Sequence, residues 1–165
     1  MKPEYLPTSG VSTLENAYKL RLQRKAEGKK IVLTNGCFDL LHAGHVHSLQ
    51  EASKFGDELW VALNSDSGVK QLKGTSRPIY LEEQRALLLC ALSCVKLVFL
   101  FDGENLSKEI RALQPDFYVK AGDYSLDNLN KEERSALKDA GSKIEFVSFL
   151  KGISTSSTIS KICAS

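Results

Sequence analysis

The sequence predicts an α/β fold in which a doubly wound parallel sheet of five strands carries helices on both faces. Short apolar runs alternate with helical stretches along most of the 165 residues, as in βαβ units. The runs are rich in Val, Leu, Ile and Phe and alternate little with polar residues, which is typical of strands buried on both faces. Polar or glycine-rich segments follow several runs, where ligands of doubly wound sheets bind. These observations favour a Rossmann-like sheet with its site at that edge.

The first helix is predicted to begin at Ser12, because Glu15 three residues later completes a capping box. It is expected to run to about Ala26 and to stop at Gly28. The five strands are predicted at Ile31–Thr34, Leu59–Leu63, Leu97–Phe101, Phe117–Val119 and Ile144–Val147. The other helices are predicted near His45–Phe55, Ser65–Leu72, Leu81–Ser93, Leu106–Leu113, Lys131–Ala140 and from about Ser156.

Length and composition indicate a single globular domain over residues 1–165, with an N-terminal segment and helix in 1–29 and the core in 30–165. Hydrophobic residues make up 42% and charged residues 25%, which excludes a disordered tail or a coiled coil. The net charge of +2 is too small to indicate a nucleic-acid binder. The basic excess lies in residues 1–30, which hold seven basic and three acidic side chains, so any anion site in the remaining body must be local.

No apolar run approaches the ~18 residues that a membrane span requires, so no membrane partner is expected. The N-terminus lacks the apolar core of a signal peptide. The four cysteines form no C-x-x-C motif, which favours a reduced protein. We therefore expect a cytoplasmic location.

The segment after the first predicted strand carries the strongest chemical signal. Asn35 and Gly36 end that strand, and the next helix begins near Gly44, so free backbone N–H groups and the helix dipole favour a phosphate there. His42 and His45 are placed to donate hydrogen bonds to its oxygens. With His47, they make three histidines in six positions, and a zinc site is the alternative, although no cysteine or carboxylate cluster completes one.

The H-x-G-H signature from His42 to His45 matches the nucleotidylyltransferase superfamily, and the longer stretch TNGCFDLLHAGH resembles the heptose 1-phosphate adenylyltransferase family. In many bacteria that unit is the second domain of a bifunctional enzyme that makes ADP-heptose. The resemblance covers roughly residues 12–162. The other matching segments are Val61–Asp66, Leu72–Gly74, Arg77–Ile79, Glu83–Arg85, Lys120–Tyr124 and Gly152–Ser156.

The resemblance implies a role for each matching residue. The catalytic residues it implies are His42, His45 and Lys73. Those implied to bind the nucleotide are Asn35, Gly36, Cys37, Phe38, Asp39, Gly44, Asn64, Asp66, Lys120, Gly122, Asp123, Ser154, Thr155 and Ser156. Arg77 and Arg85 are implied to hold the substrate phosphate, with Arg85 at an edge of its helix.

Several of these residues also have ordinary structural interpretations. Asp66 is equally suited to cap the following helix, Lys73 to be a solvated loop residue, and Arg85 to form a surface salt bridge. Cys37 lies near a helix N-terminus, which would lower its pKa, although an inert small residue is the simpler interpretation. Ala121 stands where the family usually has glycine and would be strained if that place needs a positive φ.

The implied reaction is transfer of AMP from ATP to a sugar 1-phosphate, with release of pyrophosphate. Mg²⁺ is expected on the triphosphate with no certain protein ligand; Asp39 is the candidate, either for the metal or for orienting a histidine. The expected partners are ATP and a phosphorylated sugar. Superfamily members are often dimers, so a homodimer is an expected assembly. The length leaves no room for a sugar kinase, which is expected on a separate chain upstream in the pathway.

Two other functions stay open at this point. One is a cytidylyltransferase that uses CTP and glycerol 3-phosphate or a similar small phosphate or phosphonate, since that family shares H-x-G-H and the Gly152–Thr155 segment. The other is a non-catalytic nucleotide-binding module, against which His42, His45 and Lys73 argue.

Overall fold

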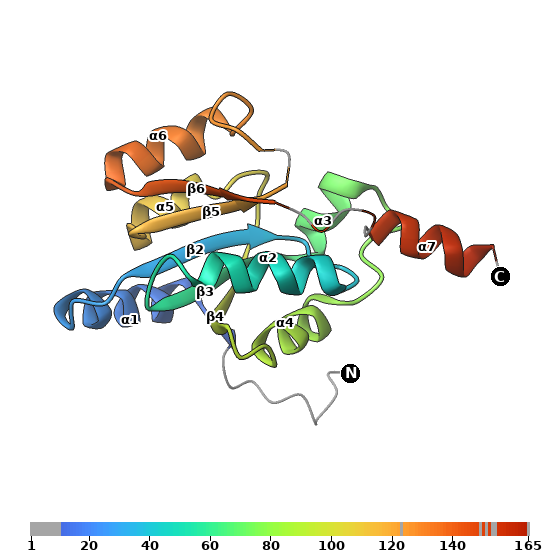
Figure 1. Cartoon of the computed structure of the whole chain (residues 1–165), viewed down its shortest axis with the longest axis horizontal. Coiled ribbons are helices and arrows are strands. Elements are labelled where there is room, and N and C mark those ends of the chain that lie inside the picture. The colour runs from blue at the N-terminus through green and yellow to red at the C-terminus, as the bar shows by residue number, and fades with distance from the viewer. Residues whose placement is uncertain (1–10, 123, 149, 151, 153–154, 165) are drawn as a thin grey trace.

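The computed structural model describes residues 11–122, 124–148, 150, 152 and 155–164 (Figure 1). The strands are β1 (Val11–Ser12), β2 (Ile31–Gly36), β3 (Glu58–Asn64), β4 (Val95–Phe101), β5 (Phe117–Ala121) and β6 (Lys143–Val147). The helices are α1 (Leu14–Ala26), α2 (Ala43–Ser53), α3 (Asp66–Lys73), α4 (Glu82–Cys90), α5 (Ser107–Leu113), α6 (Lys131–Ala140) and α7 (Thr155–Cys163).

The strands form one parallel sheet in the order β1-β4-β3-β2-β5-β6. The five predicted strands are confirmed, and β1 is the additional, sixth strand. It pairs with the outer edge of β4 through Val11 and Ser12. A two-residue strand has no periodicity to detect, which is why the sequence pattern did not indicate it.

The predicted start of the first helix is wrong by one residue. Thr13 is the N-cap of α1, and its hydroxyl accepts a hydrogen bond from the Asn16 backbone N–H at 3.2 Å. Ser12 belongs to β1 instead, so its backbone is committed to the sheet.

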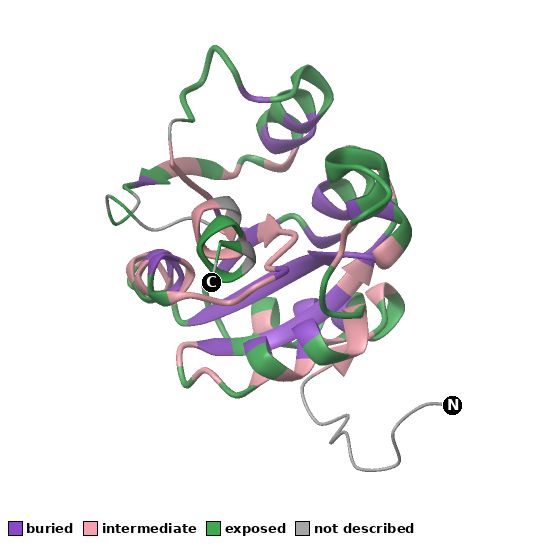
Figure 2. Ribbon diagram, turned by 90° about the vertical axis from the view of Figure 1, so that its right-hand side faces the viewer, coloured by how far each residue is buried: buried purple, intermediate pink, exposed green. Residues whose placement is uncertain are grey.

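Helices cover both faces of the sheet, as the pattern predicts. One face packs against α1, α5 and α6 around Trp60, Phe99 and Tyr118, which are fully buried. The other packs against α2 and α4 around Leu49, Leu63 and Leu89. Figure 2 shows the buried central strands enclosed by helices that are exposed on their outer sides. In the described part of the chain, none of the helices combines the length and apolar composition needed to span a bilayer.

The topology determines where a ligand site forms. The chain adds β3 and then β4 on one side of β2, and adds β5 and then β6 on the other side. The strand order therefore reverses between β2 and β5, and a crevice opens there at the carboxyl ends of the strands. Asn35 and Gly36 end β2, while Lys120 and Ala121 end β5. The sequence motifs thus meet at one edge of the sheet.

Candidate active site

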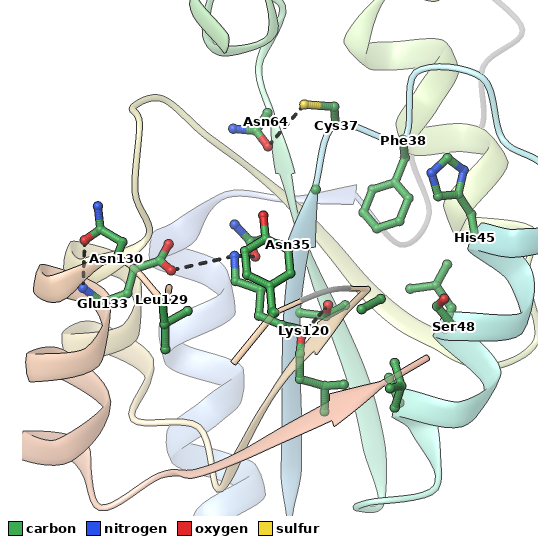
Figure 3. Close-up of a pocket in the computed structure, with 18 of the residues that line it drawn as sticks. Asn35, Cys37, Phe38, His45, Ser48, Asn64, Lys120, Leu129, Asn130 and Glu133 are labelled. Atoms are coloured by element: carbon green, nitrogen blue, oxygen red, sulfur yellow. Dashed lines mark hydrogen bonds and ion pairs between the residues drawn. The ribbon is translucent and has the colours of Figure 1, made fainter. Parts of the chain in front are cut away.

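A cavity of about 620 Å³ lies at the carboxyl edge of the sheet, over the ends of β2 and β5 (Figure 3). Eight of the residues predicted for the site line it: Asn35, Gly36, Cys37, Phe38, His45, Asn64, Lys73 and Lys120. Other predicted residues are described but are not part of this lining: Asp39, His42, Gly44, Asp66, Arg77, Arg85, Gly122 and Thr155. Asp123, Ser154 and the side chain of Ser156 lie outside the described residues.

The two histidines of the H-x-G-H motif are held against each other at the start of α2. His42 is the N-cap, with extended backbone, and its Nδ1 accepts a hydrogen bond from the backbone N–H of His45 at 3.3 Å. An accepting Nδ1 carries no proton, so the neutral ring of His42 carries its proton on Nε2. The rings stack with centroids 3.8 Å apart and planes inclined by 14°. The helix start therefore presents imidazole as well as backbone donors.

His45 lines the cavity as a neutral imidazole at pH 7. Burial is the main cause that lowers its pKa to about 4, and the neighbouring His42 and Lys73 contribute to the same shift. The edge of the Phe38 ring packs against it, with centroids 5.3 Å apart. Its Nδ1 is buried and has no hydrogen-bond partner among the described residues. Burial also lowers the pKa of His42. Both rings are thus hydrogen-bonding groups rather than fixed cations.

Lys73 supplies the positive charge that the two imidazoles do not. It is the last residue of α3, directly before Gly74, rather than part of the following loop as the sequence indicated. Its side chain is exposed and lines the cavity. No carboxylate of the described chain lies within salt-bridge distance of it. An uncompensated ammonium at this place suits phosphate oxygens.

Gly36 is needed for a close approach. A Cβ at Gly36 would meet the Phe38 ring at 2.9 Å, so the ring can lie here only over a glycine. The sharp backbone turn falls on Phe38 itself, which has a φ of +45°. Gly36 is the last residue of β2, and the chain turns two residues beyond it.

Asp39 is buried beneath the loop that precedes α4. Its carboxylate accepts hydrogen bonds from Arg77 Nε and from the backbone N–H groups of Ile79 (2.7 Å) and Tyr80 (3.1 Å). Among the described residues its hydrogen-bond partners thus do not include a histidine, and its role toward a metal stays an untested prediction. Across the residues that the structure describes, no three His, Cys, Asp or Glu side chains are grouped to hold a metal ion.

Arg85 is buried and joins neighbouring loops through its hydrogen bonds. The prediction that it lies at the edge of its helix is wrong. Its side chain has no exposed surface. Nη1 donates to the carbonyls of Cys37 (2.7 Å) and Asn64 (2.8 Å), Nε donates to the Tyr80 carbonyl (2.9 Å), and Nη2 pairs with Asp66 at 2.8 Å. These bonds hold the loops after β2 and β3 to α4. The phosphate contact expected of Arg85 stays an untested prediction.

One interpretation of the sequence was that Asp66 caps α3, and this is wrong. Ser65 is the N-cap, and its hydroxyl accepts from the Gly68 N–H at 3.1 Å. The Asp66 carboxylate binds Arg85, and its backbone N–H donates to Glu82 at 2.8 Å. The capping residue of α3 is thus one residue earlier than predicted, whereas that of α1 is one residue later.

Cys37 is a half-buried thiol facing Asn64, with its sulfur 3.8 Å from Asn64 Oδ1. Burial raises its pKa above the ordinary value, and the opposing effect of Lys73 and Arg85 does not overcome this. The suggestion that the helix N-terminus lowers the Cys37 pKa is therefore wrong, and the inert interpretation agrees with its surroundings.

The loop after β5 is unstrained at Ala121. Ala121 lies within β5, paired with Val147, and it is Gly122 that has a positive φ, of +110°. The backbone of Ala121 therefore has a conformation that any residue can adopt. Thr155 begins α7, which in Figure 1 projects beyond the carboxyl edge of the sheet. The nucleotide contacts predicted for Ser154, Thr155 and Ser156 rest partly on residues outside those described.

A buried polar cluster closes one side of the cavity. Lys120 Nζ donates to Asn35 Oδ1 at 2.7 Å and lies 3.6 Å from a Glu133 oxygen. The Tyr118 hydroxyl contacts Asn35 (3.1 Å) and Glu133 (3.2 Å), and the Leu106 N–H donates to Glu133 at 2.9 Å. Figure 3 shows Asn35, Lys120 and Glu133 facing one another. Burial lowers the pKa of Lys120, while Glu133 opposes this.

Sequence reasoning identified Asn35 and Lys120 but missed Glu133. One signal was present: Glu133, Ala136 and Leu137 follow the i, i+3, i+4 pattern of the buried face of α6. A carboxylate on an apolar face requires a partner, because burying an unpaired charge is costly. Sequence alone did not indicate that this partner would be Lys120.

Comparisons with known proteins show which family the chain resembles in sequence and fold. Residues 33–161 match the model of the family described as Cytidylyltransferase-like. The chain is 46% identical over 138 residues to the "Bifunctional protein HldE" of Geobacter sulfurreducens, covering 84% of this chain and 28% of that protein. It is also 46% identical over 148 residues to the protein of the same name from Wolinella succinogenes, covering 90% and 30%. The chain thus spans less than a third of the length of these relatives.

Two solved structures share the fold. A lipopolysaccharide core biosynthesis protein from Thermoplasma volcanium superposes with a TM-score of 0.62 at 30% identity, over 76% of this chain and all of that one. A pantoate-beta-alanine ligase from Francisella tularensis has a TM-score of 0.58 over 94% of this chain and 79% of that one. At 13% identity the second likeness concerns the fold alone.

Proposed function

The chain belongs to the cytidylyltransferase-like family, and we propose that it is a nucleotidyltransferase that moves AMP from ATP to heptose 1-phosphate, giving ADP-heptose and pyrophosphate. The observation that carries this proposal is the pair of stacked, neutral imidazoles of His42 and His45 at the start of α2. The ammonium of Lys73, which has no carboxylate partner among the described residues, lines the same cavity as His45. Such a set binds and polarises phosphates without forming a covalent intermediate.

In the proposed reaction an oxygen of the acceptor phosphate attacks the α-phosphorus of ATP. A new P–O bond forms, the bond from the α-phosphorus to the bridging oxygen breaks, and its electron pair leaves with pyrophosphate. Nε2–H of His42 and the His45 ring would donate hydrogen bonds to the triphosphate. Lys73 would neutralise charge that develops on the transferring phosphoryl group.

Mg²⁺ would enter with the triphosphate, whose charge it partly neutralises. The described residues fit a Mg²⁺ ion held by the triphosphate better than one held by protein side chains. The candidate ligand, Asp39, is already bound to Arg77 and two backbone N–H groups. Octahedral Mg²⁺ is commonly held by phosphates, water and few carboxylates.

The choice of ATP and a heptose phosphate is supported by the similar proteins. Relatives 46% identical to this chain carry the name of a bifunctional protein, and the structure at 30% identity belongs to a lipopolysaccharide core biosynthesis protein. We also propose a homodimer, testable by sedimentation, and a sugar kinase that supplies the phosphorylated acceptor.

Purified protein with Mg²⁺, each of the four nucleoside triphosphates and a panel of phosphorylated acceptors tests the proposal by pyrophosphate release. We expect turnover with ATP and heptose 1-phosphate. Turnover with CTP alone and a small phosphate such as glycerol 3-phosphate would refute the heptose assignment. ATP binding without turnover on any acceptor would indicate a non-catalytic module.

A further inference from the structure

The cavity has two halves of different chemistry. The half beside α2 is mainly apolar and is lined by Phe38, Leu49, Ala52, Val119, Ala121 and Val147. The half beside α6 is mainly polar: besides Leu129, it is lined by Asn35, Lys120, Tyr124, Asn128, Asn130 and Glu133. Figure 3 shows Phe38, His45 and Ser48 on the first side and Asn35, Lys120 and Glu133 on the second. A flat heterocyclic base suits the apolar half, so the polar half is left for the other substrate.

The two lysines of the cavity differ in whether a carboxylate lies beside them. Lys73 is exposed and has no carboxylate partner among the described residues, so it attracts phosphate. Lys120 is 11% exposed and lies 3.6 Å from Glu133, itself 4% exposed, so this pair has no net charge. A phosphate dianion placed beside the pair would meet the Glu133 carboxylate in a poorly solvated place, where repulsion is strong. The pair therefore favours uncharged hydrogen-bonding groups.

The polar half also has directed hydrogen-bonding capacity. Asn35 Oδ1 accepts from both Lys120 and Tyr118, which fixes the orientation of its amide. Among the described residues no acceptor binds Asn35 Nδ2, which remains a donor beside the cavity. Lys120 has three N–H donors, and its ammonium lies 5.2 Å from the ring centroid of the exposed Tyr124. Ammonium and amide donors with an aromatic surface suit a ring that carries several hydroxyls.

We infer that the α6 half of the cavity binds the ring hydroxyls of the sugar acceptor, and that Glu133 is a positioning residue that sets its specificity. Lys120 and Asn35 would contact the hydroxyls. Glu133 would hold Lys120 in place and cancel its charge, so that a neutral polyol is preferred to a sugar carrying a second anionic group. The inference rests on the proposed function. It assigns Lys120 and Asn35 to the acceptor, whereas the sequence resemblance implied that they bind the nucleotide.

The test is the Glu133→Gln variant, assayed with a sugar 1-phosphate and with the same sugar carrying a second phosphate. The measured quantity is kcat/KM for the monophosphate divided by kcat/KM for the bisphosphate. Because Glu133→Gln removes one hydrogen-bonded charge, we expect this ratio to fall about 10- to 100-fold. The ATP dissociation constant, measured by calorimetry, should stay within about twofold of wild type. A purely structural role would lower both acceptor rates together and leave the ratio unchanged.

Glu132→Gln is the matched control, because it removes the same charge from the next, exposed position of α6 and does not line the cavity. We expect it to keep the wild-type ratio. If Glu133→Gln fails to fold by circular dichroism, Asn35→Ala takes its place. That variant should raise the KM for the sugar phosphate about 10-fold with ATP affinity unchanged.

The outcomes separate the inference from the proposed function. A wild-type protein that turns over no sugar phosphate overturns both. Turnover with an unchanged ratio in Glu133→Gln overturns the inference alone. Weakened ATP binding in Asn35→Ala, with acceptor KM unchanged, would assign this half of the cavity to the nucleotide and also overturn it.

Discussion

His42 and His45 are coupled through one hydrogen bond and one ring contact: the backbone N–H of His45 donates to His42 Nδ1, while their rings stack at 3.8 Å. The bond both caps α2 and sets the tautomer of His42. The stack places the ring of His45, which lines the cavity, next to a donor that the helix start has already oriented. Helix capping and phosphate binding thus depend on the same side chain.

We expect His45→Ala to reduce turnover by at least ~10²-fold, the usual cost of removing one donor to a charged transition state. The fold should be unchanged, because Nδ1 of His45 has no hydrogen-bond partner among the described residues. Pyrophosphate release and circular dichroism measure the two effects. His47→Ala is the control on the same helix, since His47 does not line the cavity. Near-wild-type turnover by His45→Ala would refute its assigned role.

The low pKa of His45 predicts how stability depends on pH. In the unfolded chain a histidine binds a proton near pH 6.5, whereas burial lowers the folded-state pKa of His45 to about 4. Between these values the unfolded state binds the proton and the folded state does not, so the free energy of unfolding falls as the pH falls from 6.5 to 4. Urea denaturation of His45→Gln across this range should show a shallower fall. Parallel curves for variant and wild type would contradict the shifted pKa.

Replacement of Arg85 by Met should destabilise the protein by about 3 kcal/mol or more, because it leaves the Asp66 carboxylate without its partner and strips donors from buried carbonyls. The urea midpoint measures the loss. Arg134→Met, an exposed position on α6, serves as the control and should change the midpoint little. A stable Arg85→Met with a raised KM for the acceptor would restore the phosphate-binding role expected from the sequence.

Asp39→Asn should loosen the segment from Arg77 to Tyr80 without changing the requirement for Mg²⁺. The amide removes the charge that pairs with Arg77, and a hydrogen bond to a charged group is worth about 1.5–3 kcal/mol. Urea denaturation should report this loss, while the Mg²⁺ concentration that gives half-maximal turnover should equal that of wild type. The exposed Asp127→Asn is the control. A large rise in that Mg²⁺ concentration would assign Asp39 to the metal.

The strands and the edge of the sheet that carries the site were predictable because their signals are local. Five apolar runs form five strands, and the segments at the ends of β2, β3 and β5 contribute residues to one cavity. Errors arose where neighbouring residues compete for one role. Thr13 rather than Ser12 caps α1, because Ser12 pairs with β4, and Ser65 rather than Asp66 caps α3, because Asp66 binds Arg85.

By itself, the sequence determined the fold class, the H-x-G-H site and the resemblance to nucleotidylyltransferases, since these depend on residue type and short spacing. Only the tertiary structure decided what each charged side chain contacts. Arg85 is buried and donates to backbone carbonyls, Asp39 pairs with Arg77, and Lys120 lies beside Glu133. The physical reason is that a charge is stable in a protein interior only beside partners, and here those partners lie 13 to 48 residues away in the chain.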